Sequence, residues 1–127
     1  MILLDSNFLI SGTRENSAVA GQLITWRLSG ETLATSAIAW SEFLSGPVAA
    51  EIAGDLRTLL DGGILEFDEA CAGTAARLFI ATGRKRSLRV DAMIAATALE
   101  NDAHLATRNL EDFQPFVPHG LKLATRD

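Results

Sequence analysis

The chain has 127 residues, 48% hydrophobic and 21% charged, which predicts one globular domain spanning residues 1–127. Its single cysteine, Cys71, excludes an internal disulfide and a cysteine-based zinc cluster, and a net charge of −5 is not typical of a protein that coats nucleic acid. No apolar run approaches the ~20 residues of a membrane span, and Asp5 interrupts the N-terminal run before a signal-peptide core can form, so we expect a cytoplasmic protein.

Residues 1–4 form an apolar run too short for a helix, which is typical of a strand covered on both faces. Helices are predicted where apolar residues recur at helical spacing between capping and stop residues, as between Ser17 and Gly30. By these criteria we expect helices at 17–29, 37–46, 48–61, 69–83 and 91–100, and further strands at 33–35, 64–67, 103–107 and 121–124. Strands separated by helices pair in parallel, so the predicted fold is α/β, a three-layer α/β/α sandwich with a mainly parallel sheet of about five strands.

Three carboxylates lie beside apolar segments. Asp5 directly follows the first strand and precedes another apolar run, Phe8-Leu9-Ile10. Asp91 opens a predicted helix at the head of its apolar stripe, and Glu42 lies in a mostly apolar helix. Ordinary alternatives exist, since Asp5 and Asp91 suit turns or helix caps and Glu42 suits a solvated helix face.

A fourth group of oxygen donors follows the strand at 103–107, where the segment after Arg108 offers Asn109 and Asp112. Ligands of parallel sheets bind outside the carboxyl ends of the strands, so we expect these side chains to share one edge with the three carboxylates. Oxygen donors without His or Cys suit Mg²⁺ or Mn²⁺, cations that typically serve phosphoryl chemistry.

Basic residues are concentrated just before Asp91. Four of the eleven positive residues of the chain fall in this run: Arg84, Lys85, Arg86 and Arg89. The run is either a solvated loop or a local site for anions such as phosphate groups.

Four segments together resemble the PIN-domain family, and most closely the VapC-type toxins of bacterial toxin–antitoxin modules. They are Leu3-Leu4-Asp5-Ser6-Asn7, Ala39-Trp40-Ser41-Glu42-Phe43, the stretch from Val90 to Ala98, and Leu105-Ala106-Thr107-Arg108-Asn109. The resemblance covers essentially the whole chain, in order. It implies a Mg²⁺-dependent endoribonuclease, with Mn²⁺ as a substitute, that hydrolyses RNA phosphodiesters with a metal-activated water. It also implies a homodimer controlled by a small VapB-like antitoxin, whose helix we expect against the apolar elements near 48–60.

The resemblance further assigns roles to individual residues. Asp5 and Asp91 would be metal ligands, while Glu42 and Asp112 would complete the catalytic acids by orienting waters or a second ion. Ser6 and Asn7 would hold Asp5 or a phosphate, and the basic run would grip the RNA backbone. Many family members carry an Asp directly after the Thr-Arg pair, where this chain has Asn109. Whether Asn109 or Asp112 fills the fourth acidic place stays open.

Other functions fit the sequence less well. A PIN-like module that binds without cleaving remains an alternative because Asn109 is uncharged. A phosphatase with an Asp after its first strand expects a second Asp at the place of Asn7, and a phosphoacceptor domain expects a Lys where Thr107-Arg108 stands.

Overall fold

A computed structural model describes residues 1–14 and 17–124. In chain order its elements are β1 (Ile2–Leu4), α1 (Ser6–Gly12), α2 (Ala18–Leu28), β2 (Leu33–Ser36), α3 (Ala37–Leu44), α4 (Ala50–Leu59), β3 (Gly63–Leu65), α5 (Glu69–Ala81), the short 3-10 helix η1 (Arg86–Leu88), α6 (Arg89–Glu100), β4 (His104–Ala106), α7 (Leu110–Phe113), the 3-10 helix η2 (Gln114–His119) and β5 (Lys122–Leu123). Within these residues five strands form one sheet in the order β3-β2-β1-β4-β5, and every neighbouring pair is parallel. The predicted α/β/α class is confirmed.

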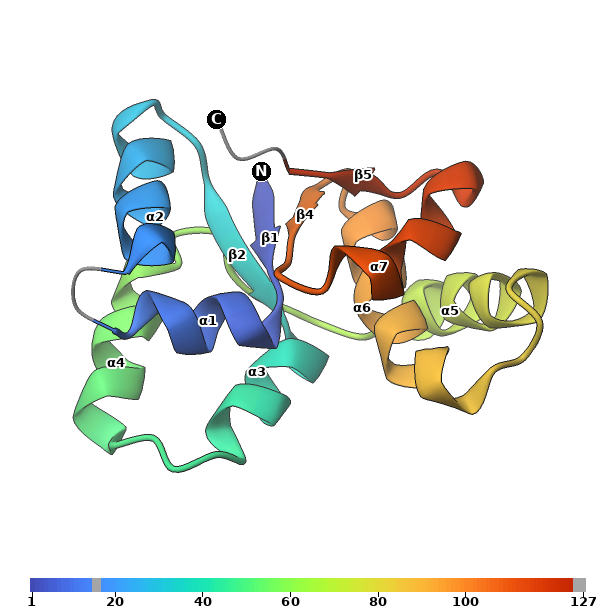
Figure 1. The fold of residues 1–127 in the computed structure, drawn as a ribbon, viewed down its shortest axis with the longest axis horizontal. Coiled ribbons are helices and arrows are strands. Elements are labelled where there is room, and N and C mark those ends of the chain that lie inside the picture. Colours follow the sequence, from blue (N-terminus) through green and yellow to red (C-terminus); the bar gives the residue numbers. More distant parts are fainter. Residues whose placement is uncertain (15–16, 125–127) are drawn as a thin grey trace.

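Two hydrophobic cores lie on opposite faces of this sheet, because successive strand residues point to opposite sides. Ile2 and Leu4 pack with side chains of α1, α2 and α4, whereas Leu3 packs with those of α5, α6 and η2. Figure 1 shows the same division, with α2 and α4 on one side of the strands and α5 and α6 on the other. Cys71 of α5 is free and buried.

The strand register brings three chain segments to one edge of the sheet. Leu4 of β1 pairs with Thr35 of β2 and with Ala106 of β4. The residues that follow these strands are Asp5, the start of α3 and Thr107. They therefore emerge side by side at the carboxyl edge, where ligands of parallel sheets bind.

The helices differ from the sequence prediction in three places. α1 and α7 were not predicted as helices, because seven and four residues are too few for a helical period to be visible. α6 begins at Arg89, directly after η1, so Asp91 is the third residue of the helix and not its N-cap. Elsewhere the predicted helix ends lie at most two residues beyond the observed ones, within the usual uncertainty of helix boundaries.

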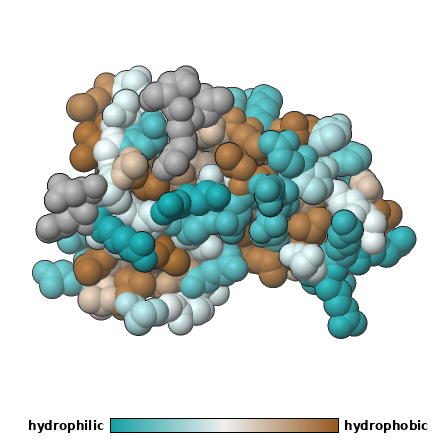
Figure 2. Space-filling model, viewed as in Figure 1, coloured by the Kyte–Doolittle hydropathy of each residue, from teal (hydrophilic) through white to brown (hydrophobic). Residues whose placement is uncertain are grey.

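The surface is not uniformly polar. Apolar residues reach the surface at several places on the face in view, including the side of the molecule that carries α2 and α4 (Figure 2). Ile24 and Leu28 of α2 are 59% and 84% exposed, and Ile52 of α4 is 44% exposed. Across residues 1–14 and 17–124, no helix has the length and apolar character needed to cross a membrane.

Candidate active site

Asp5 lies at the junction of β1 and α1, and its carboxylate is fixed by two hydrogen bonds. The side chain is buried, with 4% of its surface exposed. As the N-cap of α1, its Oδ1 accepts from the Ser6 N–H at 2.8 Å, while Oδ2 accepts from the buried Thr107 hydroxyl at 2.8 Å. Burial raises the pKa of Asp5, the two hydrogen bonds oppose that rise, and the charge of Asp112 adds to it. The charged form is thus held in place but poorly solvated.

Asp91 comes to the same edge from the first turn of α6, where it is half-buried. Its pKa is raised from 3.8 to about 6, chiefly by burial and then, in decreasing order, by the charges of Asp5, Asp112 and Glu42. Like charges act on one another in this way only over short distances. The four predicted acids therefore belong to one electrostatic group, which we call the acidic cluster.

Glu42 and Asp112 stand on the exposed side of this cluster. Glu42 lies near the end of α3, whose N-terminus is capped by Ser36 through a 3.0 Å bond from the Ala39 N–H. Desolvation raises the pKa of Glu42, the charge of Asp5 adds to this, and a hydrogen bond from Ser6 opposes it. Asp112 lies on α7 beside a polar cleft of about 360 Å³.

The acidic cluster has no basic partner among the described residues. Ion pairs in residues 1–14 and 17–124 join Met1 to Glu31, Arg27 to Asp61 and Lys122 to Asp102, all outside the cluster. The same part of the chain contains no group of three His, Cys, Asp or Glu side chains placed to hold one metal ion. Mg²⁺ usually retains several waters and takes only one or two carboxylates from a protein. The donors therefore fit a hydrated ion on two carboxylates, and they do not fit a closed protein cage.

The comparisons with known proteins bear on this arrangement. A family model described as the PIN domain matches residues 2–114. The chain belongs to the PIN domain family. A comparison with curated protein sequences gives no match.

Solved structures similar to this PIN domain include FitAB, FitAcB and a toxin–antitoxin complex. The structure of FitAB bound to an IR36 DNA fragment has a chain with 25% identity and a TM-score of 0.76, covering 98% of this chain and 94% of that one. FitAcB from Neisseria gonorrhoeae gives 25% identity and a TM-score of 0.73, with 98% and 97% covered. A toxin–antitoxin complex from Klebsiella pneumoniae gives 27% identity and a TM-score of 0.71, with 90% and 91% covered.

The three residues expected to support the acids, Ser6, Asn7 and Asn109, make different hydrogen bonds. Ser6 donates its backbone N–H to Asp5, as described. The side chain of Asn7 instead accepts from the backbone N–H of Arg108 at 3.1 Å. Asn109 occupies the N-cap position of α7 without a side-chain cap bond, and its N–H donates to the Thr107 hydroxyl at 3.0 Å.

The predicted basic run lies at the surface between α5 and α6. Arg84, Lys85 and Arg86 are exposed, and Arg84 follows Gly83 in a left-handed turn. Arg89 is already engaged, since its guanidinium carbon lies 4.4 Å from the centre of the Phe79 ring. The first three residues are thus free to meet an external anion, while Arg89 also anchors α6 to α5.

Sequence reasoning overlooked two residues of this region, Arg108 and Ser11. The Arg108 guanidinium donates to the hydroxyl of buried Ser11 at 2.8 Å. Ser11 lies 97 residues away in the chain, and no local pattern indicates such a pairing. The only feature of the sequence that pointed to Arg108 was its position next to Thr107 in the motif after β4.

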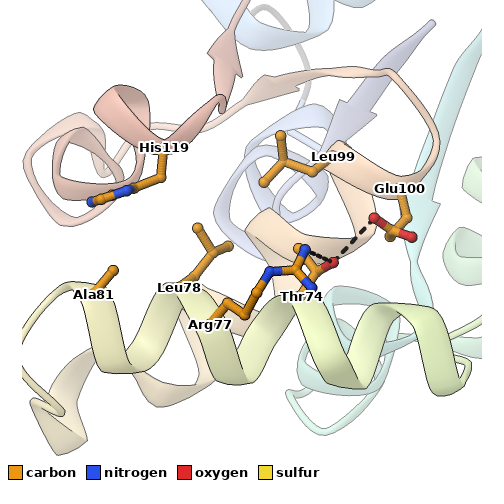
Figure 3. A pocket seen from close by; sticks show the side chains of 7 residues that line it. All are labelled: Thr74, Arg77, Leu78, Ala81, Leu99, Glu100 and His119. Atoms are coloured by element: carbon orange, nitrogen blue, oxygen red, sulfur yellow. Dashed lines mark hydrogen bonds between the residues drawn. The ribbon is translucent and has the colours of Figure 1, made fainter.

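A separate cleft of about 410 Å³ lies at the far end of α6 (Figure 3). Arg77 donates to the Thr74 hydroxyl at 2.8 Å, and that hydroxyl donates to Glu100 at 3.1 Å. Glu100 is nine residues beyond Asp91 on α6, which corresponds to about 14 Å along the helix axis. None of the predicted site residues lines this cleft, so it is distinct from the acidic cluster.

Proposed function

We propose that this PIN domain is a Mg²⁺-dependent endoribonuclease and the toxin of a toxin–antitoxin pair. The observation that supports this most directly is the acidic cluster, in which burial and mutual repulsion raise the pKa of Asp91 to about 6 without a basic partner in ion-pair contact among the described residues. Such a cluster is stabilised by binding a divalent cation. The family match and the toxin–antitoxin structures support a nuclease of this type.

In this proposal Asp5 and Asp91 hold the ion. A bound Mg²⁺ or Mn²⁺ supplies charge stabilisation to a phosphodiester under attack and makes water more acidic. Thr107 and Ser6 keep both Asp5 oxygens oriented, so this carboxylate does not have to reorganise when charge develops. Glu42 and Asp112, at the exposed side of the cluster, orient water and accept its hydrogen bonds. Arg84, Lys85 and Arg86 contact backbone phosphates of the RNA.

We further propose that an antitoxin covers the apolar surface of α2 and α4. Leu28 and Ile24 of α2 and Ile52 of α4 are exposed apolar side chains of the kind that an amphipathic helix of a partner buries. The similar structure from Klebsiella pneumoniae is a toxin–antitoxin complex. For the homodimer, an apolar groove of about 280 Å³ between α5 and α6, which includes Phe79, Ile80 and Met93, is the candidate contact.

Cleavage of RNA by the purified protein tests the nuclease. We expect endonucleolytic products with Mg²⁺ or Mn²⁺, none with excess chelator, and none from Asp91→Asn in either metal. Asp55→Asn, on the exposed face of α4, is the matched control and should cleave as the unmodified protein does. Metal-independent cleavage would contradict the proposed mechanism, and RNA binding without cleavage would favour the non-catalytic module.

Growth of a bacterial host tests the toxin. Expression of the chain alone should arrest growth, and co-expression of the neighbouring reading frame should restore it. Asp91→Asn expressed to the same soluble level should leave growth unchanged. Normal growth with soluble, RNA-cleaving protein would contradict the assignment as a toxin while leaving the nuclease intact.

A further inference from the structure

Two consecutive residues after β4, Thr107 and Arg108, make three hydrogen bonds to α1 and to its N-cap. The Thr107 hydroxyl donates to Asp5, and the Arg108 N–H donates to the Asn7 side chain. The Arg108 guanidinium donates to Ser11, which lies one helical turn beyond Asn7 on the same face of α1. The segment is thus attached to α1 at three points along its length.

The acceptor at the last of these points is itself held firmly. Ser11 is 4% exposed, and its carbonyl accepts from the hydroxyl of Ser17, the N-cap of α2, at 2.8 Å. A charged donor bound to a buried hydroxyl makes a stronger hydrogen bond than a neutral pair in water. The guanidinium therefore ties the loop after β4 to the buried Ser11 of α1, which also accepts a bond from the N-cap of α2.

The Arg108 guanidinium forms no ion pair with the acidic cluster among the described residues. It is turned to Ser11 instead. Through this bond its influence is geometric. Thr107 precedes Arg108 and holds Asp5, and the short helix with Asp112 begins two residues after it.

We propose that Arg108 is a positioning residue that locks α1 to the segment after β4 and so fixes Asp5 and Asp112 relative to each other for cation binding. This inference rests on the proposed function for its consequence, metal affinity, but the lock itself exists without metal. Two measurements test the lock and its effect on metal affinity separately.

The first readout is amide hydrogen exchange of the metal-free protein. Arg108→Met keeps the length of the side chain and removes its donors, and Ser11→Ala removes the acceptor. Each should speed exchange of the Arg108 and Asn109 amides about tenfold, as expected for loss of one charge-assisted hydrogen bond. The double variant should equal the single ones, because both remove the same contact. Additive effects, or unchanged exchange, would overturn the lock.

The second readout is Mn²⁺ binding measured by calorimetry. Arg108→Met and Ser11→Ala should each raise the Kd about tenfold, the range seen when groups that orient metal ligands are removed. Arg57→Met, an exposed arginine of α4, is the matched control and should leave the Kd unchanged. Unchanged affinity in Arg108→Met would overturn the positioning role. Absence of Mn²⁺ binding by the unmodified protein would instead refute the proposed function, with the exchange measurement still testing the lock.

Discussion

At the scale of single residues, the carboxylate of Asp91 is unfavourable to folding in its charged form. Its pKa in the folded protein, about 6, lies above the ordinary value of 3.8. The folded state therefore binds a proton more tightly than the unfolded state, and stability increases as the pH falls from above 6 toward 4. Above pH 6 the full electrostatic cost is present unless a cation relieves it.

Replacing Asp91 by Asn should remove this cost. At pH 7.5 in chelator, we expect Asp91→Asn to raise the free energy of unfolding by about 1 kcal/mol, since solvent around the half-exposed side chain screens part of the interaction. The gain should disappear by pH 4, where the native Asp91 is protonated. Thermal denaturation at pH 7.5, 6 and 4 measures this, and a gain independent of pH would contradict the electrostatic cause.

The two candidates for the fourth acidic place should respond differently. The charge of Asp112 raises the pKa values of Asp5 and Asp91, so it is close enough to attract a cation to them. Asp112→Asn should raise the Mg²⁺ concentration for half-maximal cleavage about tenfold, the effect of removing a group next to the ligands. Asn109→Ala should change it less than twofold, and Asn109→Asp should lower it only if this side chain faces the ion. A larger effect of Asn109→Ala than of Asp112→Asn would reverse the assignment.

At the scale of elements, the sheet was more predictable than the connections that form the site. Short apolar runs between helices indicated the five parallel strands, because buried strands need apolar residues on both faces. Asp5 could be chosen because it follows such a run, and Asp91 and Glu42 because they lie among apolar residues of predicted helices. The bonds of Thr107 to Asp5 and of Arg108 to Ser11 could not be predicted, since they join residues 102 and 97 positions apart. Their formation depends on strand order, which local periodicity does not contain.

Helix α3, which carries Glu42, depends on a buried cap. Ser36 is fully buried, and its hydroxyl oxygen accepts from the Ala39 N–H at 3.0 Å. Ser36→Ala leaves that donor without a partner and should lower the free energy of unfolding by about 1 kcal/mol. Urea denaturation measures the change. Ser45→Ala, at the exposed opposite end of α3, should stay within about 0.5 kcal/mol, and equal effects at both ends would show that burial of the cap is unimportant.

At the scale of the whole molecule, a negatively charged protein is proposed to bind a polyanion. The net charge of −5 makes long-range attraction to RNA unfavourable, so binding depends on few local contacts and on the cation. Replacing Arg84, Lys85 and Arg86 together by Gln should weaken RNA binding and reduce the slope of log affinity against log salt by up to about 2. The melting temperature should not change, because all three side chains are exposed. An unchanged salt slope would show that the run does not contact phosphate.

The direct passage from β1 to α1 limits how the length of this chain can vary. Leu4 ends the strand, Asp5 caps the helix and Ser6 begins it, so no spare residue lies between them. One residue inserted after Leu4 would turn α1 by about 100° relative to the sheet and carry Phe8 out of the core. An insertion beside exposed Gly46, between α3 and α4, would only lengthen a surface loop. Descendants of this gene can therefore change length beside Gly46. A single codon added after Leu4, in contrast, would disrupt both the fold and the site.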